Sequence, residues 1–161
     1  GSRSEDDGAL HCMRSAAPNL WLIAAGWGSV VASLAHLVCI IGGPNWYRFM
    51  GAGERIARAA ERGEWLPTIL TLAIAAVIAG WAAYAFSAAG IIIRLPLTRT
   101  ALVLISLVLL LRACAYFVGP MWRPDLSHGF MMWSSLIVFV LGLCFAIGTT
   151  KAWPIVSERS V

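Results

Sequence analysis

Residues 100–121 read TALVLISLVLLLRACAYFVGPM, and this apolar run decides the class of the protein. A helix needs about 20 apolar residues to cross the hydrocarbon core of a bilayer, and the run meets that length. It shows no alternation of apolar and polar residues with a period of two, so a strand is disfavoured. Its one charged residue is Arg112, and an ionisable group inside a span indicates a functional site.

Three other apolar runs have the length of a span, and glycine or proline separates them. Gly42 to Pro44 follows the first run, Leu95 and Pro96 follow the second, and Gly119 and Pro120 follow the third. The sequence therefore predicts an all-α, polytopic, multi-pass membrane protein built as a four-transmembrane-helix bundle. The predicted spans are 21–41, 65–89, 100–119 and 130–149.

The composition supports this class. Hydrophobic residues make up 60% of the chain and charged residues only 12%, against roughly 25% charged in soluble domains. We expect one membrane domain over residues 13–161, preceded by a polar segment, 1–12, that is a disordered leader or a remnant of cloning. The net charge of +4 comes from scattered arginines, which excludes nucleic acid as an expected partner.

The connection between the first two spans contains a predicted short interfacial helix, residues 53–63. Glu54 and Arg58 are four residues apart there, a spacing that supports a helix by a few tenths of a kcal/mol. Two interpretations stay open. The helix is solvated and pairs its own charges, or Glu54 turns inward as a counter-ion.

Orientation in the membrane is weakly encoded. An even number of spans places both termini on one side, where six lysines and arginines fall, against five on the other side. We expect cytoplasmic termini. Six tryptophans lie near predicted span ends, where interfacial tryptophans are common: Trp21, Trp46, Trp65, Trp122, Trp133 and Trp153.

Two polar residues of parallel spans lie at one predicted depth. His36 precedes Gly42 by six residues and Arg112 precedes Gly119 by seven, so each lies about 9 to 10 Å below the same interface. His128 opens the fourth span on that side. His36 shares a helical face with small residues, which favours an inward orientation.

We therefore predict a polar ligand site at this face, with Arg112 as the charge anchor. His36 and Glu54 are the expected proton-linked partners, because both titrate. The alternative for His36 is a core histidine bonded to a neighbouring group, and for Arg112 it is snorkelling to the headgroups. The predicted ligand-binding residues are Arg112, His36, Glu54, His128, Trp46, Tyr47, Arg48 and Asp125.

The function expected from this site is the binding or movement of a small amphipathic or anionic ligand, with membrane lipid and a second copy of the chain as further partners. A second hypothesis is a redox subunit that binds haem b or quinone, with His36 and His128 as the axial haem ligands. A third is a structural partner subunit of a larger membrane complex. No catalytic motif is present, so enzymatic activity stays undecided.

The cysteines carry little information. A metal site can be drawn from His36, Cys39, Cys114 and His128, but no CxxC motif supports it, and we predict no metal. Lone cysteines in membrane helices are usually small apolar packing residues. A disulfide between Cys39 and Cys114 is the alternative where that face is oxidising.

Overall fold

The computed structural model describes residues 18–122 and 128–157, and the side chains of residues 18–114 and 129–154 within them. This part of the chain is all helical, without strands, as predicted. Its five helices are α2 (Leu20–Phe49), α3 (Glu54–Glu61), α4 (Leu66–Ala88), α5 (Thr98–Trp122) and α6 (His128–Ser157).

Three of these helices are long and apolar enough to cross a membrane: α2, α4 and, over Gly129–Pro154, α6. The third predicted span, 100–119, lies within α5, but the side chains of α5 are described only as far as Cys114. The four-span count therefore stays a prediction. The predicted interfacial helix over 53–63 is present as α3.

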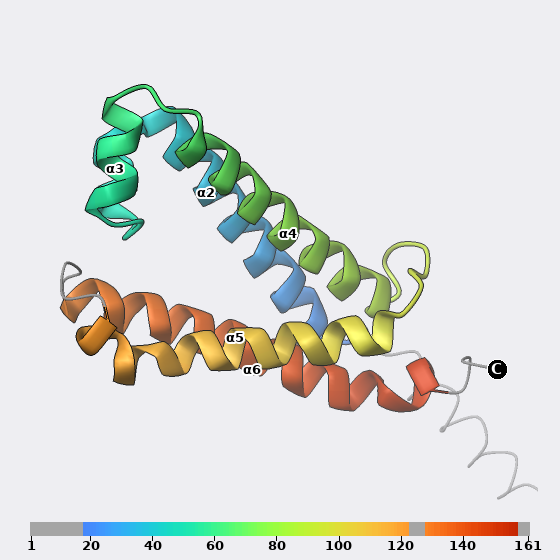
Figure 1. Ribbon diagram of the computed structural model, residues 1–161. Coiled ribbons are helices and arrows are strands. Elements are labelled where there is room, and N and C mark those ends of the chain that lie inside the picture. The colour runs from blue at the N-terminus through green and yellow to red at the C-terminus, as the bar shows by residue number, and fades with distance from the viewer. Residues whose placement is uncertain (1–17, 123–127, 158–161) are drawn as a thin grey trace, which may run out of the picture.

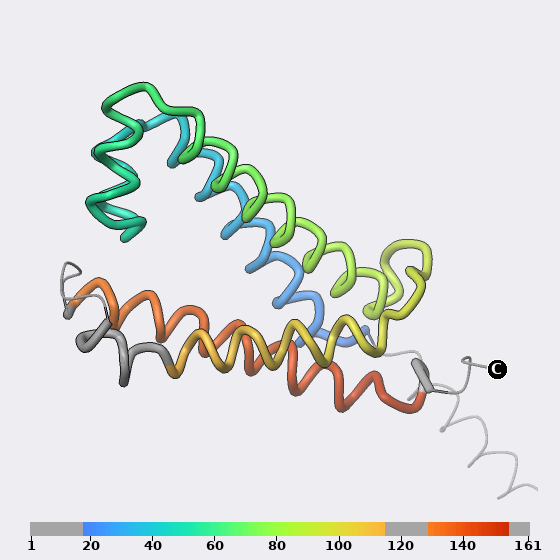
Figure 2. The backbone as a smooth tube through the Cα atoms, viewed as in Figure 1, coloured from blue at the N-terminus to red at the C-terminus, as the bar shows by residue number. Residues whose placement is uncertain are grey.

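The helices form two antiparallel hairpins, α2 with α4 and α5 with α6 (Figure 1). The hairpins meet at the end where α4 finishes and α5 begins, and they diverge toward the other end, where α3 lies (Figures 1 and 2). We call these the meeting end and the open end. The direction of the chain places the start of α2 at the meeting end and the start of α6 at the open end.

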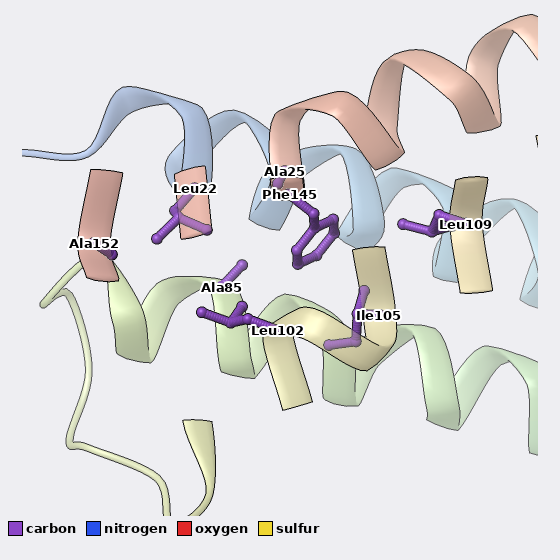
Figure 3. Close-up of a cluster of buried hydrophobic side chains, with 8 residues drawn as sticks. All are labelled: Leu22, Ala25, Ala85, Leu102, Ile105, Leu109, Phe145 and Ala152. Atoms are coloured by element: carbon purple, nitrogen blue, oxygen red, sulfur yellow. The ribbon is translucent and has the colours of Figure 1, made fainter. Parts of the chain in front are cut away.

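The main core lies at the meeting end and joins all four long helices (Figure 3). Phe145 of α6, Leu22 of α2 and Leu102 of α5 are fully buried at its centre. Lipid tails are as apolar as these side chains, so close packing rather than exclusion from water stabilises such a core. Its buried members are Leu22, Ala25, Ala85, Leu102, Ile105, Leu109, Phe145 and Ala152.

Glycines bring α2 close to its neighbours. A Cβ atom on Gly148 would lie 2.7 Å from the side chain of Leu22 and 3.1 Å from its backbone nitrogen, so only glycine fits between α6 and α2. Asn19 fixes the same contact from the end of α2. Its amide nitrogen donates to the Gly148 carbonyl at 2.8 Å, and its side-chain oxygen accepts from the Leu22 N–H at 3.4 Å.

A kink at Gly43 and Pro44 turns the last part of α2 back from the direction of the first part. Gly43 has φ 69°, a conformation that glycine adopts readily, and Pro44 is compatible with restarting a helix. The chain then runs through Phe49 and returns along α3, and we call residues 44–61 the kinked hairpin. Tyr47 and Ala57 of this hairpin bury Cys39 of α2 in a second, smaller core.

One hydrogen bond joins α2 and α4, and removing it tests how closely these two helices pack. The Ser33 hydroxyl of α2 donates to the Ala75 carbonyl of α4 at 2.8 Å. We expect Ser33→Ala to lower the free energy of unfolding by about 0.6 kcal/mol, and at most about 1.7 kcal/mol. The loss is small because the Ala75 carbonyl keeps the hydrogen bond within α4 when the serine hydroxyl is removed. Ser106→Ala is the matched control, since the buried Ser106 hydroxyl bonds to Leu102 of its own helix. Equal losses in denaturant titrations of both variants would contradict this role of Ser33.

Candidate anion site at Arg112

Arg112 lies on α5 toward the open end, and its side chain is exposed. One Nη atom donates to the Ser134 hydroxyl of α6 at 3.4 Å, which is long for such a bond. All four ion pairs in the described part of the chain join residues between Arg48 and Glu64. Within that part, no carboxylate forms an ion pair with Arg112.

The contact with Ser134 indicates which way Arg112 faces. Ser134, Leu141 and Phe145 follow one stripe of α6, at i, i+7 and i+11. Leu141 packs against Gly28 of α2, and Phe145 is in the main core. The stripe therefore faces the hairpin of α2 and α4. Arg112 therefore reaches a group on the inner face of α6. Ser134 is five residues beyond Gly129, the first residue of the apolar part of α6, or about 7 to 8 Å along the helix.

His36 is half-buried and bonds within its own helix. Its Nδ1 lies 2.7 Å from the Ala32 carbonyl oxygen, which can only accept, so the bond requires a proton on Nδ1 and leaves Nε2 as the second ring nitrogen. Among the described residues, no hydrogen bond joins His36 to Arg112 or Glu54. This geometry favours the core-histidine interpretation. Haem ligation by His36 and His128 stays a prediction, because the side chain of His128 lies outside the described part.

Glu54 is paired with arginines of the kinked hairpin. Its carboxylate accepts from Arg48 at 3.0 and 3.2 Å and from Arg58 at 3.0 Å, so the predicted pair with Arg58 is confirmed. Arg48 also donates to Glu61 at 2.7 Å. Hydrogen bonds from Arg48 and Arg58 lower the pKa of Glu54 from 4.5 to about 2. Glu54 stays ionised near neutral pH, and the arginines it pairs with are Arg48 and Arg58 rather than Arg112.

This network makes the kinked hairpin sensitive to acid. The folded-state pKa of Glu54 is lowered, so its stabilising effect is present above pH 4.5 and is lost as pH falls toward 2. We expect the protection of amides in residues 44–61, measured relative to their intrinsic exchange rate at each pH, to fall over this window, and Glu54→Gln to abolish that pH dependence. Glu64→Gln, which removes only the separate pair with Arg62, is the control. An unchanged pH profile in Glu54→Gln would sink the interpretation.

The remaining predicted site residues separate into two groups. Tyr47 is only 2% exposed, and its hydroxyl has no hydrogen-bond partner among the described residues, so it belongs to the smaller core rather than to an open site. Trp46 is exposed, covers Gly42 and meets Phe49 edge to face at 6.2 Å. Asp125 lies outside the described residues, as does the side chain of His128.

The described cysteines are free thiols, so the structure does not form the disulfide considered between Cys39 and Cys114. Cys39 is buried in the smaller core, which matches the packing role expected of it. Cys114 is exposed on α5 and Cys144 is half-buried on α6. In the described part of the chain, no three histidine, cysteine or acidic side chains lie close enough to hold a metal ion.

Basic and aromatic side chains pair at the meeting end. Arg99 lies over the ring of Trp153 with its guanidinium carbon 4.1 Å from the ring centre, and the Lys151 amine is 5.8 Å from the ring centre of Trp21. Both tryptophans were predicted near span ends. Their partners could not be predicted, because each pair joins two different helices.

A shallow apolar groove between α4 and α5 was missed by sequence reasoning. Its volume is about 210 Å³. The only signal in the sequence was Trp81, a tryptophan away from the predicted end of its span. The groove is lined by Trp81, Tyr84, Ala101, Leu104, Ile105 and Val108.

Comparison with known protein families, with curated proteins and with solved structures finds no match to this chain. The class of the protein therefore follows from the fold alone: the described part of the chain is all helical, and three of its helices are long and apolar enough to span a membrane.

Proposed function

We propose that the chain is a multi-pass membrane protein with four spans, α2, α4, α5 and α6, which binds or moves a small amphipathic or anionic ligand near the membrane face at the open end. The observation that carries this proposal is Arg112. It lies within an apolar helix, contacts the inner face of α6 through Ser134, and forms no ion pair with a described carboxylate.

The physical reason is the cost of an uncompensated charge. A cation in an apolar surrounding is unfavourable unless an anion or several acceptors satisfy it, and the interaction with an anion is stronger there than in water. The one described side-chain acceptor at Arg112 is the distant Ser134 hydroxyl. Its planar guanidinium matches a carboxylate or phosphate through two parallel hydrogen bonds.

The charges elsewhere support a ligand that comes to Arg112 rather than to the kinked hairpin. Arg48 and Arg58 are already neutralised by glutamates.

The described cations at the meeting end, Arg94, Arg99 and Lys151, have no acidic residue beside them in the described sequence there, which suits the negatively charged cytoplasmic leaflet. The proposal therefore keeps both termini cytoplasmic.

The test is native mass spectrometry of the full chain purified from membranes. We expect bound anionic amphipath on the wild-type protein and a loss of about tenfold or more in its retention in Arg112→Gln, the size expected for a hydrogen bond to a charged group. Arg99→Gln, which removes a cation at the other end of α5, should retain the wild-type adduct. Equal retention in the two variants would contradict the anchor role of Arg112.

A further inference from the structure

The kinked hairpin lies on the water-facing side of the Arg112 site. A Cβ atom on Gly51 would collide with the ring of Phe130, so the turn of the hairpin packs directly against the start of α6 (Figure 1). Phe130 and Ser134 are four residues apart and share one face of α6. Because Arg112 donates to Ser134, the hairpin contacts α6 about one helical turn from the site, toward the membrane face at the open end.

The kinked hairpin is held together by its own charges. Arg48, at the end of α2, pairs with Glu54 and Glu61 of α3 at 3.0 and 2.7 Å. Arg58 pairs with Glu54 at 3.0 Å. All four residues lie within 44–61, so these ion pairs link parts of the hairpin to each other and not to the long helices. The hairpin can therefore move as one body without breaking them.

A glycine with positive φ flanks this body on each side. Gly43 precedes it with φ 69°, and Gly63 follows it with φ 71°. A Cβ atom built on either glycine has no neighbour within 4 Å, so the backbone there has room to change its angles. Hinges are usually a few such positions at the ends of structural elements. Gly43 and Gly63 are therefore placed to act as a pair of hinges.

The contact that docks the hairpin on α2 contains an unsatisfied polar group. Tyr47 packs with Cys39 in the smaller core and is only 2% exposed. Its buried hydroxyl has no hydrogen-bond partner in the described part of the chain. Such a group loses its hydration without compensation, so docking is weaker than the apolar contact alone would make it. The hairpin is therefore poised to undock.

We propose that the kinked hairpin is a gate on the water-facing side of the Arg112 site. The inference rests on the proposed function and adds the regulation of the same site. When docked, the hairpin closes the inner face of α6 between Ser134 and the membrane face. When it swings out about Gly43 and Gly63, an anionic ligand passes between Arg112 and water. Arg112 is exposed with the hairpin docked, so the gate controls this passage and not the availability of the cation.

The experiment is stopped-flow binding of dansylaminoundecanoate, a fluorescent carboxylate, to the full chain in neutral-lipid nanodiscs. Energy transfer from tryptophan to the dansyl group reports binding, and the part of the signal that Arg112→Gln loses belongs to the site. Gly51→Ala collides with Phe130 and should raise the association and dissociation rate constants by about tenfold each. Tyr47→Phe removes the unsatisfied hydroxyl and should lower both by about fivefold. The dissociation constant should match that of the wild-type protein in each variant.

Tyr84→Phe, the same substitution on α4 near the meeting end, is the control and should leave both rate constants unchanged. If binding depends on Arg112 but the rate constants are the same in wild type, Gly51→Ala and Tyr47→Phe, the gate is overturned and the anchor still stands. A wild-type protein without any signal that depends on Arg112 would overturn the proposed function itself. Gel filtration and circular dichroism show whether each variant is folded, and Tyr47→Phe tests the gate even where Gly51→Ala is not.

Discussion

Replacing Phe145 with alanine should lower the free energy of unfolding by about 3 to 5 kcal/mol, the range for removing a large buried aromatic side chain. Phe145 is fully buried where the two hairpins meet, and its ring contacts a core built by all four long helices (Figure 3). The loss comes from dispersion contacts and from the cavity left behind, because the surrounding backbone cannot close the gap. Unfolding by denaturing detergent, followed by circular dichroism, measures it.

Phe139→Ala on the same helix is the control. Its ring is 44% exposed on the lipid-facing side, and we expect a change within about 0.5 kcal/mol for such a surface position. A loss at Phe139 as large as the loss at Phe145 would mean that the hairpins do not pack through the core described above.

Replacing Gly51 with alanine should detach the kinked hairpin from the start of α6. Gly51 has φ 71°, where a side chain is strained by about 1 to 3 kcal/mol, and its added methyl would collide with the ring of Phe130. Overpacking of this kind costs about 1 to 3 kcal/mol more. We expect faster amide hydrogen exchange in residues 44–61, with little change at the meeting end.

Gly63 offers a matched control, since it has the same φ of 71° but open space around its Cα. Gly63→Ala therefore measures the backbone strain without the collision. The double variant Gly51→Ala with Phe130→Ala has no collision with the ring. It should therefore recover the part of the exchange protection in residues 44–61 that the collision removes. If Gly51→Ala and Gly63→Ala speed up exchange equally, Phe130 does not hold the hairpin in place.

The length of the apolar runs predicted most of the helices. Each predicted span lies within a long helix, except for the first and last residues of the span 65–89. The main exception is the end of the first span. Gly42, Gly43 and Pro44 were interpreted as a terminator, but the helix restarts after Gly43 and continues to Phe49. Proline fits the first turn of a helix as well as it ends one, so local sequence could not distinguish a stop from a kink.

The site was predictable where local spacing determines it. The pair between Glu54 and Arg58 follows from helical periodicity and was predicted. The stronger attachment of Glu54 to Arg48, six residues earlier, depends on the turn at residues 50–53 that reverses the chain between α2 and α3, so no spacing rule shows it. The groove was missed for the same reason, since its two walls are faces of α4 and α5 that only tertiary packing brings together.

The most direct test of the central claim is a thermodynamic cycle between the charge of Arg112 and the charge of the ligand. Dissociation constants of tetradecanoate and its methyl ester are measured for the wild-type chain and for Arg112→Gln in neutral-lipid nanodiscs. We predict that the wild-type protein prefers the acid, and that Arg112→Gln loses about 1.5 to 3 kcal/mol of this preference. A preference that is the same in both proteins would contradict Arg112 as the anion anchor.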